Sequence, residues 1–507
     1  MVSALKKAFF KNPKKVIPQV MATMIAAIGY LGTGLVRGWA SPGVPSLVES
    51  NQFNLTDSDK AWITSLPPLC AFFGSLVAGP CLQFLGRRLT LIIISIPFTM
   101  GFMVLGCAVF SPSIGVVYAG RILSSLANGA ATPSSQIYIS ECSSPRIRGA
   151  LGSITALWLA LGILIAYVVG AFLPWYALAW VESGFPILLL IGMLFMPETP
   201  GWLLSKGRKD DAQNSLQKLR GRHTDVTLEL QRIEDTITNG AEKQQQMPTL
   251  FNKPVLVPFG LTLALMWFQQ FSGVNAVLFY TVSIFDEAGG SVNRHLATII
   301  VGLVQFLSTI LSIILIDKAG RRILLLISAF IMAFAQASLG SFFYIKETRG
   351  QEAASAIGWL PLTSLVIFIA AFSIGFNNIP FLIMGEILPS RFRALLGPLS
   401  SSFNLIMTFT VVRTFPIMAD SVGKYGVFWF YMACCIVAVF FVYFCLPETK
   451  GKSLEEIEKM FGGGLACQDM ENPKPIAEVE RAPRLILGRY DSEDEDEDDG
   501  RLAPTIA

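Results

Sequence analysis

The tripeptide Gly86-Arg87-Arg88 stands between two long apolar runs, and it returns as Gly320-Arg321-Arg322 between two others. Two further patterns return at nearly the same interval. They are Glu141 with Arg148, repeated as Glu386 with Arg393, and Pro197-Glu198-Thr199, repeated as Pro447-Glu448-Thr449. The three offsets are 234, 245 and 250 residues. Three unrelated patterns at one interval indicate a duplicated unit.

The composition indicates a membrane protein. Apolar residues make up 52% of the chain, charged residues 15%, and the mean hydropathy is +0.55, whereas a soluble domain has about 25% charged residues. A spanning helix needs about 20 mostly apolar residues. Twelve runs qualify: 16–36, 61–85, 89–110, 113–140, 149–172, 176–196, 254–284, 296–316, 323–345, 358–384, 395–418 and 425–446. We therefore expect an all-α membrane protein with twelve transmembrane helices in two six-helix halves.

The runs divide the chain into five parts. These are a basic N-terminus (1–15), an N-terminal half (16–202), a helical linker (203–253), a C-terminal half (254–446) and a tail (447–507) that is acidic and expected to be disordered near 491–499. Lys and Arg mark cytoplasmic loops. They are absent from 38–59, 111–114 and 173–180 but frequent in the N-terminus, the linker and the loops on the same side as the linker. Both termini are therefore predicted to be cytoplasmic.

The same charge pattern places residues 38–59 outside the membrane. This stretch contains Asn54-Leu55-Thr56, a glycosylation sequon, although such a tripeptide also occurs by chance. We expect a multi-pass protein of the plasma membrane, with an intracellular membrane as the alternative. Duplicated membrane halves usually hold a substrate between them near the bilayer midplane, which favours a transporter.

The repeated motifs carry a family resemblance. Together with Gly120-Arg121, the run from Gln269 to Asn275 and Pro447-Glu448-Thr449-Lys450-Gly451, they make the chain similar to sugar porters of the major facilitator superfamily over about 15–460. It most resembles facilitative hexose transporters and arthropod trehalose transporters. The resemblance implies facilitated uniport of a hexose or of trehalose by alternating access. A proton-coupled symporter and a non-transporting sugar sensor remain alternatives.

Neutral polar side chains in the seventh span are the candidate sugar site. Gln269, Gln270, Asn275 and Tyr280 form its densest polar set. Amides donate and accept hydrogen bonds, as sugar hydroxyls do, without the desolvation cost of a charge. The resemblance implies that the two glutamines and Asn275 contact the sugar. Hydrogen bonding between helices is the alternative role.

Other pocket positions depart from the hexose-transporter pattern. They are Ala156, Gln305, Asn377-Asn378, Phe381 and Asn404-Leu405. Of these, Gln305, Phe381 and Asn404 are candidate substrate contacts. The loss of one glutamine and two indoles makes the expected pocket less polar and roomier. Such a pocket is compatible with a disaccharide.

Charged residues at helix ends are candidates for a conformational gate. They are Arg87, Arg88, Glu141, Arg148, Arg321, Arg322, Glu386 and Arg393. Pairs that bridge the halves would close the cytoplasmic side, whereas isolated arginines would only anchor loops. Gly375 and Pro380 interrupt the tenth span, which predicts a flexible gate at 374–380 or an inert kink.

The remaining titratable residues suggest no chemistry. His223 and His295 are the only histidines, and neither has a metal-ligand or catalytic-triad pattern around it. We expect no enzyme activity, cofactor, metal or nucleic-acid partner; the expected partners are a sugar and the lipid bilayer, and the oligomeric state stays open. Glu182, in the sixth span, is the one candidate acid for proton coupling. Its Leu- and Ile-rich surroundings favour a peripheral packing role, and an acid that faces the bundle is the alternative.

Overall fold

The computed structural model describes residues 13–145, 147–221, 225–244, 253–288, 293–389, 392–452, 456–457 and 460–461. All regular elements within these ranges are helices. The basic N-terminus up to residue 12, His223 and the acidic block at 491–499 lie outside the described residues. The predictions made for them therefore stay predictions.

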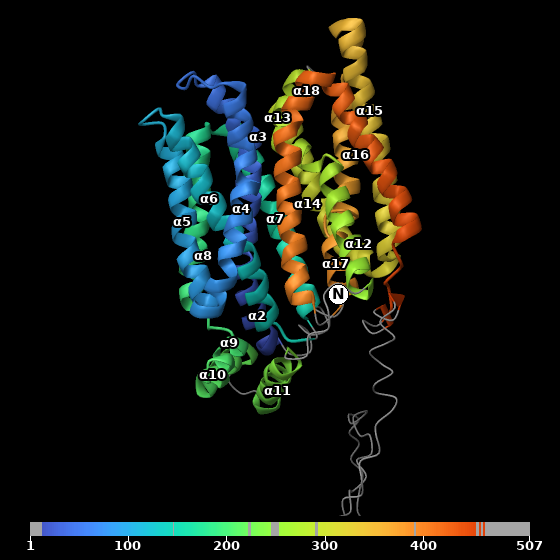
Figure 1. The fold of residues 1–507 in the computed structure, drawn as a ribbon. Coiled ribbons are helices and arrows are strands. Elements are labelled where there is room, and N and C mark those ends of the chain that lie inside the picture. The colour runs from blue at the N-terminus through green and yellow to red at the C-terminus, as the bar shows by residue number, and fades with distance from the viewer. Residues whose placement is uncertain are drawn as a thin grey trace, which may run out of the picture. The chain divides into compact units, whose positions relative to one another are not determined.

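The N-terminal half contains seven helices in six spans (Figure 1). They are α2 (Pro13–Ala26), α3 (Ile28–Glu49), α4 (Asp57–Leu85), α5 (Arg87–Cys107), α6 (Ile114–Cys142), α7 (Arg148–Phe172) and α8 (Trp175–Phe195). α2 and α3 follow each other directly as one span. The sequence-based end of this span at residue 36 was wrong, because the helix continues through Pro42 and Pro45 to Glu49. Trp39 and Leu47 are buried in this extension, so packing holds it helical.

Three short helices form the linker: α9 (Pro200–Ser205), α10 (Lys209–Arg220) and α11 (Thr227–Gln244). Leu216 of α10 and Leu230 of α11 are buried in a small apolar cluster. Leu228 is 69% exposed. Two residues along a helix amount to about 200°, and Leu228 and Leu230 therefore lie on opposite faces.

The linker helices rest on the N-terminal half. The Arg220 guanidinium, which is nearly buried, donates to the carboxylate of Glu229 and, at 2.8 Å, to the carbonyl of Cys142 at the end of α6. Arg220 thereby joins α10, α11 and α6. We call this end of the bundle the linker side, and the other end the opposite side.

The C-terminal half consists of α12 (Lys253–Phe271), α13 (Val274–Ala288), α14 (Arg294–Ala319), α15 (Arg321–Ser355), α16 (Leu360–Ile374), α17 (Ile379–Ile387) and α18 (Arg393–Cys445). α12 and α13 are two pieces of one span, and so are α16 and α17. The 53 residues of α18 would extend for about 80 Å as one helix. The bilayer core measures only about 30 Å. Gly423, with a φ of 74°, folds α18 back into two spans (Figure 1).

The described residues account for the predicted twelve spans. Ten helical segments are long and apolar enough to cross a membrane, and one of these, Leu395–Cys445, is the folded pair in α18. The remaining span is α6, which is long enough but carries buried polar residues such as Arg121 and Asn128. Its interior position explains its low hydropathy, because polar side chains in a membrane face the bundle.

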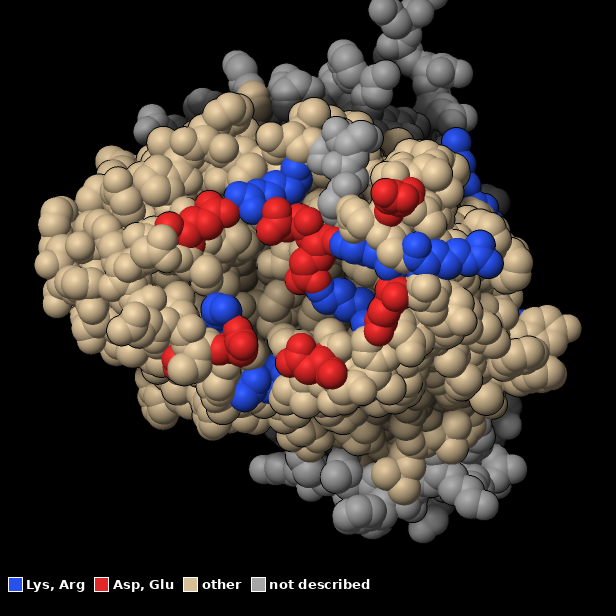
Figure 2. Space-filling view, turned by 90° about the horizontal axis from the view of Figure 1, so that it is seen from above, with Lys and Arg blue, Asp and Glu red and all other residues tan. Residues whose placement is uncertain are grey.

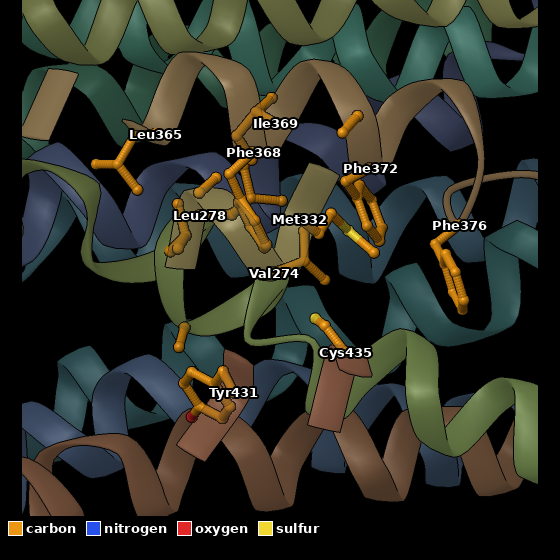
Figure 3. Close-up of a cluster of buried hydrophobic side chains, with 14 of the residues drawn as sticks. Val274, Leu278, Met332, Leu365, Phe368, Ile369, Phe372, Phe376, Tyr431 and Cys435 are labelled. Atoms are coloured by element: carbon orange, nitrogen blue, oxygen red, sulfur yellow. The ribbon is translucent and has the colours of Figure 1, made fainter. Parts of the chain in front are cut away.

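A large apolar core fixes the broken helices of the C-terminal half. Figure 3 shows Val274 and Leu278 of α13 beside Met332 of α15 and Phe368 and Phe372 of α16. Across the two halves, α3 packs against α13, α4 against α18 and α7 against α14. These contacts place the interrupted seventh span between the halves.

Candidate functional site

Four buried amide side chains meet where α12 ends and α18 passes. The amide nitrogen of Gln270 donates to the Asn404 oxygen at 3.0 Å and to the Gln269 oxygen at 3.3 Å. Asn404 donates back to Gln269 at 2.7 Å, and Asn275 donates to Gln270. Each of the four is at most 5% exposed. We call Gln269, Gln270, Asn275 and Asn404 the amide cluster; the sequence predicted all four of its members.

Gln269 also repairs the break between α16 and α17. Its nitrogen donates to the carbonyl of Phe376 at 2.6 Å and to that of Asn377 at 3.2 Å. These carbonyls lie between the two helices, where the regular main-chain bonding stops. Since unpaired main-chain groups are costly inside a membrane, Gln269 has a structural task besides any contact with a ligand.

Three other predicted contacts lie outside this cluster. The Tyr280 hydroxyl donates to the Val412 carbonyl at 3.2 Å, at a non-helical kink of α13. Gln305 on α14 is 1% exposed, and its side-chain oxygen has no hydrogen-bond partner among the described residues. Phe381 on α17 is 40% exposed. Gln305 is therefore the one of these three that offers a free buried acceptor.

A second polar set, which no sequence motif marked, lies in the N-terminal half. Thr33 of α3 donates to the Asn128 oxygen of α6 at 2.6 Å, and Tyr30 donates to Gln136 at 3.3 Å. Thr132, within 3.1 Å of Thr33, completes the set. The low hydropathy of α6 was the available signal, because a polar spanning helix belongs in the interior.

Side-chain contacts between the halves gather on the opposite side. Ser41 of α3 accepts a hydrogen bond of 3.2 Å from the main-chain nitrogen of Val282 in α13. Arg294 of α14 pairs with Glu49 of α3. The Arg413 guanidinium of α18 lies 4.9 Å from the ring centre of Trp62 in α4. These contacts join the two halves at this end of the bundle.

Charged side chains surround a hollow on the same side, as Figure 2 shows. A pocket of about 910 Å³ at this end of the bundle lies where α13, α15 and α18 meet. Its charged lining consists of Asp286, Glu287, Lys346, Glu347, Asp420 and Lys424. No group of three or more metal-ligating side chains occurs among the described residues.

On the linker side, the predicted charges pair within each half. Arg87 donates to Glu141 at 2.8 Å in the N-terminal half, and Arg321 donates to Glu386 at 3.1 Å in the C-terminal half. Within the described ranges, neither pair reaches the other half. The two pairs therefore do not form the bridge between halves that the sequence suggested; in this conformation each ties helices of its own half together.

The two halves use their second arginines in the same way. Arg88 donates to the carbonyls of Met193 and Leu194 at 3.0 and 2.6 Å, at the end of α8. Arg322 donates to those of Val442 and Tyr443 at the end of α18. Each arginine thus satisfies carbonyls that a helix end leaves without partners.

The glutamates of the repeated Pro-Glu-Thr motif cap helices. Glu198 accepts hydrogen bonds from the main-chain nitrogens of Arg87 and Arg88, and Glu448 accepts them from those of Arg321 and Arg322. The preceding Gly86 and Gly320 have φ values of 95° and 94°. A Cβ atom on Gly86 would lie 2.5 Å from Glu198. Glycine therefore permits both the turn and the close approach of the carboxylate.

Main-chain donors also tune the acidity of Glu448. Partial burial acts to raise its pKa, but the N–H groups of Lys450, Arg321, Arg322 and Thr449 outweigh burial and hold the pKa below its ordinary value. Its carboxylate therefore remains ionised as a cap for α15.

The hydrogen bonds around the paired glutamates, Glu141 and Glu386, differ between the two halves in one bond. Thr449 donates to the second oxygen of Glu386 at 2.6 Å. The equivalent atoms in the other half, Oε2 of Glu141 and Oγ1 of Thr199, are buried and have no partner among the described residues. The N-terminal half therefore lacks the threonine–glutamate hydrogen bond that the C-terminal half has.

The remaining gate candidates lie at helix starts. Arg148 begins α7 and is exposed, whereas Arg393 begins α18 and donates to the Leu388 carbonyl at 3.0 Å. Pro380 is the second residue of α17, a position where a helix needs no main-chain donor. Gly375 packs against Ser328 of α15 so closely that a Cβ atom would clash. Gly375 therefore serves close packing, and Pro380 starts a helix instead of kinking one.

The acid of the sixth span is an interior residue. Glu182 on α8 has no exposed surface, and both carboxylate oxygens lack a hydrogen-bond partner among the described residues. The favoured peripheral position was wrong, and the alternative of an acid that faces the bundle holds. Arg121 of α6, also fully buried, is the cation whose charge acts on it. Its guanidinium lies 4.8 Å from the ring centre of Trp39 and donates to the carbonyls of Val36 and Ile63.

Comparison with known proteins identifies the family. The family model described as "Sugar (and other) transporter" matches residues 22–461. This chain belongs to the sugar transporter family. The facilitated trehalose transporter Tret1 of Drosophila pseudoobscura pseudoobscura is 40% identical over 92% of the chain, which spans 54% of that relative's length. The Tret1-2 homolog of Drosophila simulans is 39% identical over 90% of the chain and 94% of its own length.

Solved structures of sugar transporters share the fold. The inward open conformation of the xylose transporter XylE from E. coli has a TM-score of 0.73 at 26% identity, covering 86% of this chain and 98% of XylE. Its partially occluded inward open conformation has a TM-score of 0.72 at 25% identity, covering 86% and 99%. These neighbours confirm the predicted major facilitator architecture of two membrane halves.

Proposed function

We propose that this sugar transporter moves trehalose or a hexose down its gradient by facilitated uniport. The amide cluster carries the proposal, because it gathers four side chains that donate and accept hydrogen bonds in a buried, uncharged place between broken helices. The named Drosophila relatives are facilitated trehalose transporters, which favours the disaccharide. The chain spans about half the length of the first of these relatives. The substrate of this chain is therefore proposed and not taken over from that relative.

The bonding within the cluster suits a carrier. The amides of the cluster bond one another, and none of their buried nitrogen or oxygen atoms is left without a partner among the described residues. A sugar then exchanges amide–amide bonds for amide–hydroxyl bonds, and such an exchange yields only a modest net free energy. Modest affinity allows release on the far side. Gln305 supplies a further acceptor, and Phe381 and Tyr280 line the route to the cluster in this proposal.

Alternating access in this account opens one end of the bundle while the other closes. The bonds of Ser41, Glu49 and Trp62 to the C-terminal half hold the opposite side shut. The charge pairs, Arg148 and Arg393 keep the helices of each half together while the halves rock. The packed break at Gly375 and the helix start at Pro380 shape the tenth span beside the substrate.

The charge distribution supports an orientation with the linker and both termini in the cytoplasm. In this proposal the protein lies in the plasma membrane. Asn54, exposed in the loop between α3 and α4, would then face the outside and accept a glycan. We propose no catalytic reaction.

Proton-coupled symport is the second candidate, favoured by one observation. Glu182 is fully buried beside the charge of Arg121 without a hydrogen-bond partner among the described residues. An ionisable group inside a membrane is a candidate proton carrier. The related structure of XylE is described as a proton:xylose symporter.

An uptake panel tests the proposed substrate. Purified protein in proteoliposomes should take up radiolabelled trehalose, with glucose and fructose as comparison sugars. Saturable uptake of at least one of these sugars, reduced by an excess of the unlabelled sugar, supports the proposal. No uptake of any of them above protein-free liposomes would contradict it.

A further inference from the structure

A pocket of about 940 Å³ lies away from the amide cluster, where α9 and α10 of the linker meet the start of α5 and the end of α8. It is bounded by spanning helices on one side and by the amphipathic linker on the other. Binding pockets for small molecules measure about 300–1,000 Å³. The space is therefore large enough for a phospholipid headgroup.

One wall of the pocket is basic. Arg88, Arg208 and Lys218 line it together with Glu198 and Asp211. Glu198 is occupied as the cap of α5, and Asp211 pairs with Arg208 at 2.7 Å. Among the described residues Lys218 has no carboxylate partner. The lining therefore has an excess of positive charge, and Lys218 and the exposed part of Arg208 are available to an anion.

The adjoining wall is apolar and exposed. Leu89 of α5 is 44% exposed and Leu194 of α8 is 51% exposed, both on helices that span the membrane. Exposed leucines on spanning helices face lipid chains. Trp202 of α9 lines the same pocket and donates its indole N–H to the Gln83 carbonyl. Tryptophan favours the boundary between lipid and water, so the pocket sits at headgroup depth.

We propose that this pocket binds an anionic phospholipid, with its phosphate against Arg208 and Lys218 and its acyl chains along Leu89 and Leu194. A basic wall joined to a lipid-facing wall matches an amphiphile with a negative head. A free phosphate would use only the basic wall. The arrangement also fixes the lipid at the joint between the linker and the N-terminal half.

Native mass spectrometry of the full chain, titrated in detergent with phosphatidylserine, tests the proposal. The matched variants are the double substitution Arg208→Gln with Lys218→Gln, and Lys209→Gln as the control. Lys209 is on the same helix but pairs with Glu234 and does not line the pocket. Each cation near an anionic membrane surface adds about fivefold to binding, so the double variant should bind phosphatidylserine about thirtyfold more weakly.

The control and a competitor make the outcomes distinct. Lys209→Gln should bind as the unsubstituted protein does, and inorganic phosphate should not displace the lipid. Equally weakened phosphatidylserine binding in Lys209→Gln would show that the basic linker attracts the lipid in general, and would overturn the proposal that this pocket binds it. Displacement by inorganic phosphate would show a phosphate site without a lipid requirement and overturn the lipid assignment. Both substituted pocket residues are exposed, and unchanged thermal melting will confirm that the fold persists.

Discussion

The phenolic hydroxyl of Tyr167 in α7 donates a hydrogen bond of 2.6 Å to the main-chain carbonyl of Leu278 in α13. Tyr167 belongs to the N-terminal half and Leu278 to the C-terminal half. Four residues further along α13, Val282 donates its main-chain N–H to Ser41 of α3. Side chains of one half thus hold the main chain of the interrupted span of the other half. The seventh span is therefore bonded to α3 and α7 of the N-terminal half in this conformation.

Replacing Tyr167 by phenylalanine should loosen α13. The substitution removes the bond to Leu278 while keeping the ring, and a typical buried hydrogen bond contributes about 1 kcal/mol. Hydrogen exchange along α13 should therefore become about fivefold faster, as measured by mass spectrometry. Tyr138→Phe is the control, because the Tyr138 hydroxyl bonds the Pro197 carbonyl within the N-terminal half. Unchanged hydrogen exchange in Tyr167→Phe would show that this bond does not stabilise α13.

Substitution in the amide cluster should weaken sugar binding. Gln270→Ala leaves sugar hydroxyls and the Asn404 amide without a partner, at a cost of about 1–3 kcal/mol, which lowers affinity about 5- to 150-fold. Binding is measured by the sugar-induced rise in melting temperature.

The control for this measurement is Gln336→Ala. Gln336 is an equally buried amide that donates to the Ser272 carbonyl, outside the cluster. It should retain normal affinity. Equal affinities in the Gln270 variant and the unsubstituted protein would remove the cluster from the substrate site.

Alanine at Gly320 should destabilise the C-terminal half. Gly320 has a φ of 94°, and an added Cβ would lie 3.0 Å from the Glu448 carboxylate. The strained backbone alone costs about 1–3 kcal/mol. Gly260→Ala is the control, since its Cβ would meet no atom within 4 Å in the helix α12. The melting temperature should fall only in Gly320→Ala. Equal melting temperatures of both variants would contradict the structural role of the turn at Gly320.

The cap made by Glu448 should be sensitive to acid. Main-chain donors hold its folded-state pKa below the ordinary value. A depressed pKa stabilises the fold at neutral pH, and this stabilisation disappears as the pH falls through the folded-state pKa. The melting-temperature gap between the unsubstituted protein and Glu448→Gln should therefore shrink on acidification. Glu352→Gln, which changes an exposed acid of α15, should show no such trend. A gap that stays constant would refute the linkage.

Repeated patterns and hydropathy were enough to predict the architecture. The offset copies of Gly-Arg-Arg marked two halves, and the family match confirms the transporter class. Helix ends were less predictable. The first span passes through prolines that read as a loop, because tertiary packing of Trp39 overrides the local preference.

Partners of charged residues could not be read from spacing. The sequence brought Arg87 and Glu141 to one side of the membrane, but only the folded chain shows them paired within a half. Glu182 was misjudged because its apolar neighbours along the sequence say nothing about the helix it faces. The amide cluster was predictable, since several amides in one spanning helix need an interior position. The carbonyls that Gln269 satisfies were not, because the break between α16 and α17 creates them.

The direct test of facilitated uniport is the final sugar concentration in proteoliposomes under an imposed inward proton gradient. We expect radiolabelled trehalose, or whichever sugar the uptake panel selects, to enter until the inside concentration equals the outside one. The proton gradient should not change this final sugar concentration, either in the unsubstituted protein or in Glu182→Gln. Accumulation above the outside concentration, driven by the gradient and abolished in Glu182→Gln, would contradict uniport and make Glu182 the coupling residue.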